Sequence, residues 1–176
     1  MGALCRRIVA LSKPAHVTPE GSVVMVDVSG KGESARSARA EAIVRMSAPA
    51  RTALQEATSR KGDAFVTAQI AGIMAAKQTS ALIPLAHPLP LSHVEVRFEW
   101  TAAGTLRIEA QARTTASTGV EMEAMVAASV AALTIYDMSK SLDRSVTIET
   151  IRLLEKRGGK SGTWQRPGAQ SDAGDV

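Results

Sequence analysis

Two pairs of ionisable residues stand at opposite ends of one long, alanine-rich segment. Glu121 and Glu123 open it, Asp137 and Lys140 close it, and the residues between are mostly apolar. On a helix, acids at the N-terminal end are favoured by the helix dipole, and residues three apart share a face. A carboxylate beside an ammonium group can move protons, each group tuning the pKa of the other. The same spacing also suits a plain surface salt bridge, so both interpretations stay open.

A second candidate for a functional site is the sequence Lys61-Gly62-Asp63, which precedes a segment with the apolar spacing of a helix. Asp63 is a residue type that caps helix N-termini. An ammonium group next to free backbone N–H groups at such a terminus forms an anion site. The alternative is a surface turn with no ligand.

His87 lies in the proline-stiffened, apolar loop Ile83 to Leu89. A rigid loop can present an imidazole to a ligand, although a lone His in such a loop is more often structural. His93 follows six residues later, but no Cys or carboxylate has the spacing of a metal site. We therefore expect that neither His87 nor His93 belongs to a metal site.

The segment from Lys156 to Gly162 is basic and rich in glycine. It is not a P-loop, because that pattern needs Gly at the position of Leu154 and a helix afterwards. A basic tail that folds over an anionic substrate remains as an alternative.

Composition narrows the class of protein. The chain has 176 residues, 45% hydrophobic and 22% charged, which suits one globular domain. Its net charge of +4 fits an anionic ligand, a nucleic acid or a membrane surface. Only 3% of residues are aromatic, which disfavours base stacking on single-stranded nucleic acid. The single Cys5 and the lack of a long apolar run favour a reducing, cytoplasmic setting without membrane insertion.

Hydrophobic periodicity predicts an α+β fold, an antiparallel sheet with helices packed on one face. A flexible arm over 1–22 precedes a single domain over 23–157, and a mobile glycine-rich tail covers 158–176. The expected strands are 23–28, 38–47, 94–100, 106–110 and 146–154. The expected helices are 49–59, 64–77 with an apolar stripe of Phe65, Ile70, Ile73 and Met74, and 120–142.

Six motifs, taken in order, resemble the MoaC family of molybdenum cofactor biosynthesis. They cover residues 61–63, 71–77, 82–89, 119–124, 133–140 and 158–162, within a likeness that spans about residues 23–162. The resemblance implies a ferredoxin-like fold and a homohexamer, a trimer of dimers. It implies conversion of 3′,8-cyclo-7,8-dihydroguanosine 5′-triphosphate into cyclic pyranopterin monophosphate and diphosphate. It further implies no cofactor, a small-molecule substrate, and a contact with the radical enzyme that supplies it.

Family roles transfer to this chain residue by residue. The resemblance marks Asp137, Lys140 and Lys61 as catalytic. It marks a further set as substrate-binding: Leu85, Ala86, His87, Glu121, Met122, Glu123 and Lys156. Many members have Cys where this chain has Ala86 and Ser139, and the expected chemistry needs neither thiol.

Two other classes remain as alternatives. A non-catalytic nucleotide-binding oligomer of the same fold would keep Lys61 and Lys156 but have no use for the Asp137–Lys140 pair. A basic nucleic-acid module would show steep salt dependence of binding and no release of diphosphate.

Overall fold

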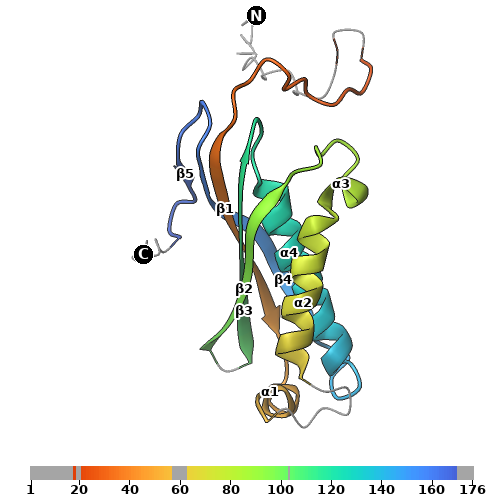
Figure 1. Ribbon diagram of the computed structural model, residues 1–176. Helices are drawn as coiled ribbons and strands as arrows, with labels where there is room; N and C mark the ends of the chain where they lie inside the picture. Colours follow the sequence, from red (N-terminus) through yellow and green to blue (C-terminus); the bar gives the residue numbers. More distant parts are fainter. Residues whose placement is uncertain (1–17, 19–20, 57–62, 103, 170–176) are drawn as a thin grey trace, which may run out of the picture.

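The computed structural model describes residues 18, 21–56, 63–102 and 104–169 (Figure 1). Its strands are β1 (Ser34–Arg45), β2 (Leu91–Ala102), β3 (Thr105–Ala116), β4 (Thr147–Arg157) and β5 (Trp164–Gln165). Its helices are α1 (Ala48–Gln55), α2 (Ala64–Lys77), α3 (Thr79–Leu82) and α4 (Glu121–Ser139).

All five strands form one antiparallel sheet in the order β2-β3-β1-β4-β5. The first four strands and the helices α2 and α4 make a β-α-β-β-α-β arrangement, which is the ferredoxin-like fold. Both long helices pack on the same face of the sheet (Figure 1). The predicted α+β class is therefore confirmed.

Small side chains let these layers lie close together. On β1, Ala38, Ala40 and Ala42 are buried under the helices, and all five alanines of α4 are fully buried as well. A Cβ atom at Gly72 of α2 would lie only 2.9 Å from the carbonyl oxygen of Ala127 in α4. The close approach holds α4 rigidly in place, and with it the functional groups at its two ends.

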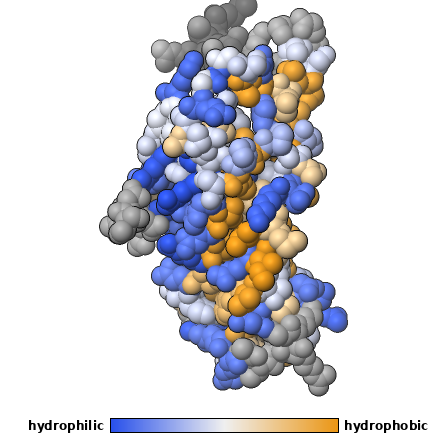
Figure 2. All heavy atoms as spheres, in the orientation of Figure 1, coloured by the Kyte–Doolittle hydropathy of each residue, from blue (hydrophilic) through white to orange (hydrophobic). Residues whose placement is uncertain are grey.

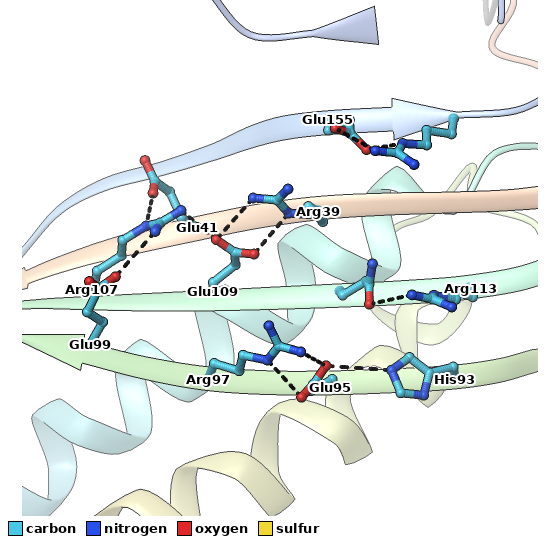
Figure 3. Close-up of polar contacts among 12 residues, drawn as sticks. Arg39, Glu41, His93, Glu95, Arg97, Glu99, Arg107, Glu109, Arg113 and Glu155 are labelled. Carbon is cyan, nitrogen blue, oxygen red and sulfur yellow. Dashed lines mark hydrogen bonds and ion pairs between the residues drawn. The ribbon is translucent and has the colours of Figure 1, made fainter. Parts of the chain in front are cut away.

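The opposite face of the sheet carries a network of ion pairs (Figure 3). The buried Glu41 accepts hydrogen bonds from Arg107 at 2.7 Å and from Arg152 at 2.6 Å. Burial alone would raise the pKa of Glu41, but these two guanidinium groups lower it below its usual value. Beside it lies a second ion pair, in which Arg39 Nε is 2.9 Å from Glu109 Oε1. The charged residues that alternate with alanines along β1 thus lie on the face of the sheet away from the helices.

Several local predictions are confirmed. Asp63 caps α2, its Oδ1 accepting from the N–H groups of Phe65 at 2.9 Å and Val66 at 3.1 Å. The bounds of α2 agree with the predicted 64–77. Pro49 lies in the first turn of α1, whose predicted end at residue 59 falls outside the described residues.

Other predictions are wrong. The stretch 23–28 is not a strand, since Val23 forms an isolated bridge and residues 24–28 have no regular structure. The predicted apolar stripe of α2 is also wrong in part, because Ile70 is 54% and Met74 61% exposed. Figure 2 shows apolar side chains gathered in a band over α2. Ala68, Gly72 and their neighbours face the core instead.

The sheet continues past the predicted domain end at residue 157. After a turn, Trp164 and Gln165 pair with Lys156 and Glu155 as the edge strand β5. The segment between β4 and β5 is therefore folded back beside the start of β1, where it lines a pocket.

Candidate functional site

Two neighbouring pockets open around the N-terminal end of α4. The larger, here called the cationic pocket, has a volume of about 600 Å³. Its cations are Lys31, Arg36, Lys156, Arg157 and Lys160. The smaller, here called the His87 pocket, has a volume of about 300 Å³. Thr118, Gly119 and Glu121 line both pockets, so the two adjoin.

Arg36 at the start of β1 joins the segments that form the cationic pocket. Its Nε donates to the carbonyl of Ala116 at 2.9 Å, and its Nη2 to that of Ser117 at 3.1 Å. The Ser117 hydroxyl in turn donates to the carbonyl of Lys31 at 2.9 Å. These bonds hold the end of β3, just before α4, against the loop that carries Lys31.

The glycine-rich turn after β4 forms the opposite wall. Gly158 and Gly159 have φ angles of 94° and 73°, a conformation that favours glycine. A Cβ atom at Gly158 would lie 2.3 Å from the carbonyl oxygen of Ala35. The two glycines therefore let the turn lie directly on β1, and Lys156 and Lys160 flank it. The Lys156 ammonium group donates to the hydroxyl of Ser161.

The His87 pocket gathers most of the residues that were predicted to bind substrate. It is lined by Leu85, Ala86, His87, Glu121, Met122 and Glu123. The first three lie in the loop between α3 and β2, and the last three in the first turn of α4. Because Lys156 lines the adjoining cationic pocket, the structure brings all seven predicted substrate-binding residues to one end of the molecule.

Glu123 is the buried carboxyl group of this site. It is only 3% exposed, and burial raises its pKa from 4.5 to about 6, with a further contribution from the charge of Glu121. A hydrogen bond with its own backbone N–H opposes the shift. A carboxyl group that titrates near neutral pH can both accept and donate protons.

We expect Glu123→Gln to stabilise the protein near neutral pH. Because the folded-state pKa is raised, protonated Glu123 favours folding, and this contribution is lost as the pH rises through about 6. Gln resembles the protonated acid, so the variant should gain up to about 2 kcal/mol at pH 7.5 and nothing below about pH 4. Urea unfolding across this pH range measures the difference. Glu121→Gln is the control and should change the free energy of unfolding less. A stability gain of Glu123→Gln that stays constant with pH would contradict the expectation.

Asp137 and Lys140 form the predicted pair at the other end of α4. Lys140 Nζ lies 2.6 Å from Asp137 Oδ1, and the side chains are 50% and 53% exposed. The hydrogen bond to Asp137 and the charge of that carboxylate raise the pKa of Lys140. Lys140 is therefore held protonated, as suits a proton donor or an anion ligand better than a base.

One chain does not bring this pair to the two pockets. Asp137 lies fourteen residues after Glu123 on a continuous helix, which corresponds to roughly 21 Å. The third predicted catalytic residue, Lys61, lies outside the described residues.

Sequence reasoning missed two cations of the larger pocket, Lys31 and Arg36. They lie far from the glycine-rich segment along the chain and belong to no motif, so only the fold reveals their proximity to it. The glycine-rich segment did contain a usable signal, since a basic tail folding over an anion was one of its two interpretations. Among the described residues, no group of three metal-ligating side chains occurs. No helix there is long and apolar enough to cross a membrane.

The fold and the pockets define a class of protein. In this ferredoxin-like domain, a pocket lined by cations adjoins a second pocket that holds an imidazole and a buried carboxyl group. Such a site suits a small molecule that carries several negative charges. The chain matches the MoaC family over residues 25–159, most of its length, and it belongs to that family. Membership places the protein in molybdenum cofactor biosynthesis.

Proposed function

We propose that the protein is a cyclic pyranopterin monophosphate synthase. In this reaction 3′,8-cyclo-7,8-dihydroguanosine 5′-triphosphate is rearranged into cyclic pyranopterin monophosphate, and diphosphate is released. The observation that carries the proposal is the grouping of the family's substrate-binding motifs, Leu85 to His87 and Met122-Glu123, around one pocket in a chain of the MoaC family.

The two pockets suit two parts of this substrate. The triphosphate brings about four negative charges, which the five cations of the cationic pocket can neutralise. The heterocycle fits the His87 pocket, where His87, Glu121 and Glu123 offer hydrogen-bonding groups. Lysine and arginine side chains here act mainly by binding and orienting the phosphates.

Closure of the cyclic phosphate defines what the chemical groups must do. A substrate hydroxyl oxygen forms a new bond to the α-phosphorus, and the bond from that phosphorus to the bridging oxygen breaks. Diphosphate leaves with the bridging oxygen, and the hydroxyl proton passes to a base. Rearrangement of the ring also moves protons on and off nitrogen and carbon. Glu123, titrating near pH 6, suits proton transfer, and protonated Lys140 suits donation to a developing negative charge.

Because the two ends of α4 lie far apart, we propose that each active site is shared between two copies of the chain. One triphosphate-sized ligand does not reach from Glu123 to Asp137 of the same chain, which lie roughly 21 Å apart. A two-fold dimer solves this by placing Asp137 and Lys140 of one copy at the pockets of the other. The proposed assembly is the homohexamer of the family, built from three such dimers.

We expect phosphate binding to depend on Lys61 and Lys156 more than on Lys160. Lys156 is half-buried on β4 and is oriented by Ser161, whereas Lys160 is exposed in the turn. Lys61→Ala and Lys156→Ala should each weaken binding of guanosine 5′-triphosphate about tenfold or more, the usual worth of a charge-assisted hydrogen bond. Calorimetry at low and high salt measures this, with larger losses at low salt. Equal losses for Lys160→Ala would make the turn the main phosphate ligand.

The proposed reaction is tested directly by incubation with the cyclised guanosine triphosphate. Diphosphate release and pterin fluorescence after oxidation are the expected products. A protein that binds the nucleotide but releases no diphosphate would be the non-catalytic oligomer instead.

A further inference from the structure

Gly119, just before α4, is a glycine for which the backbone conformation gives no reason. Its φ angle lies outside the left-handed region that favours glycine. Other glycines of this kind in the chain either face open space, as Gly30 does, or allow close packing, as Gly72 does against α4. The reason for glycine at position 119 therefore lies in what surrounds it.

The space beside Gly119 is filled by the carboxylate of Glu121. A Cβ atom at position 119 would lie 2.7 Å from Cδ and 2.8 Å from Oε1 of Glu121, and nearer still to its Oε2. Non-bonded carbon atoms pack at about 3.5–4.0 Å, so a side chain at position 119 would displace this carboxylate. Glu121 is the first residue of α4, and its side chain is thus folded back over the residue that precedes the helix by two.

The folded-back carboxylate lies where the two pockets meet. Glu121 and Gly119 line both the cationic pocket and the His87 pocket. Among the described residues that line the cationic pocket, Glu121 is the single acid. A carboxylate repels phosphate oxygens and accepts hydrogen bonds from N–H groups. At this junction it distinguishes a phosphate chain on one side from a hydrogen-bond donor on the other.

The proposed substrate carries both kinds of group. Its triphosphate is anionic, and its guanine-derived ring has N–H donors that a carboxylate accepts in charge-assisted hydrogen bonds. With the Glu121 carboxylate at the junction, the phosphates are favoured beside Arg36 and Lys156, and the ring beside His87. A carboxylate displaced from the junction would no longer hold the ring in this orientation.

We propose that Gly119 is a positioning residue, whose missing side chain holds the Glu121 carboxylate at the junction of the two pockets, where Glu121 binds the ring of the nucleotide. The inference rests on the proposed function and deepens it, because it assigns Glu121 to the ring and not to the phosphates. Gly119 acts through Glu121 alone. A change at position 119 should therefore affect recognition of the ring and leave recognition of the phosphate chain almost unchanged.

Gly119→Ala tests the proposal with two probes, guanosine 5′-triphosphate and inorganic triphosphate. The variant should bind the nucleotide about tenfold more weakly, the worth of one hydrogen bond to a charged group, and inorganic triphosphate within about threefold of wild type. Calorimetry measures both affinities. Gly30→Ala is the control and should bind both probes like wild type, since a Cβ atom there would have no neighbour within 4 Å. Equal losses for the two probes would overturn the assignment of Glu121 to the ring.

A double-mutant cycle separates an effect through Glu121 from a direct clash with the ligand or a general effect on the fold. In a Glu121→Ala background, Gly119→Ala should cause no further loss of nucleotide affinity, because the group that it displaces is gone. A second tenfold loss in that background would overturn the proposal. If Gly119→Ala alone fails to fold, the double variant should fold, and its failure to do so would also overturn the proposal.

The outcome for Gly119 is independent of the outcome for the proposed reaction. Gly119→Ala with wild-type affinity for the nucleotide would overturn the positioning role and leave the synthase reaction in place. Conversely, a wild-type protein that shows the expected binding differences but releases no diphosphate would contradict the synthase reaction alone.

Discussion

Replacing Lys140 with alanine is expected to reduce turnover at least about a hundredfold, the usual contribution of a general acid–base group. Asp137→Ala should have a similar effect, because Asp137 lies 2.6 Å from the ammonium group of Lys140 and orients it. Both side chains are half exposed, so their loss should leave the fold intact. Single-turnover formation of diphosphate, measured after quenching the reaction, reports the chemical step without interference from product release.

Lys77→Ala provides a matched control, since Lys77 is an exposed lysine in the last turn of α2. It should retain wild-type turnover. Folding of each variant is verified by circular dichroism. Near-normal turnover in a folded Lys140→Ala protein would remove Lys140 from the catalytic assignment, whatever the behaviour of Asp137.

Mixing two inactive proteins should restore activity. Glu123→Ala damages the pocket half of the proposed site, and Lys140→Ala damages the half supplied by the second copy. When equal amounts are unfolded and refolded together, half of the dimers contain one chain of each kind. Each mixed dimer has one site with both changes and one site with neither, so about a quarter of wild-type activity should return.

The control is each inactive protein refolded alone, which should stay inactive. Different affinity tags on the two chains show whether mixed oligomers form. If they form and the mixture stays inactive, each site belongs to a single chain, and the geometric argument from α4 fails. Recovery near a quarter would support the shared site.

Local features were predictable because their causes are local. The cap of α2 follows from Asp63 and the apolar residues after it, and the start of α1 follows from Pro49. The alternation of Arg39, Glu41 and Ile43 with buried alanines indicated a strand over 38–47, and the structure has β1 over Ser34–Arg45, since the period of two is a property of the strand itself. The pair Asp137 and Lys140 was likewise predictable from helical spacing.

Other features depend on contacts between distant segments. The apolar stretch 23–28 has the composition of a strand, yet only Val23 forms a bridge and residues 24–28 have no regular structure. Likewise α2 is apolar on nearly every side, so periodicity did not reveal that Ala68 and Gly72, rather than Ile70 and Met74, face the core. Close packing against α4 selects the small residues.

The sequence by itself predicted the α+β class and the hairpin and long helices of the domain, and its resemblance to the MoaC family named most of the residues that line the His87 pocket. Only the tertiary structure decided that Lys31 and Arg36 join Lys156 around a single cationic pocket. It also decided that this pocket and the Asp137–Lys140 pair lie at opposite ends of α4. The physical reason is that sequence spacing specifies neighbours along one helix or strand, whereas a binding site depends on how the sheet and the helices pack across the chain.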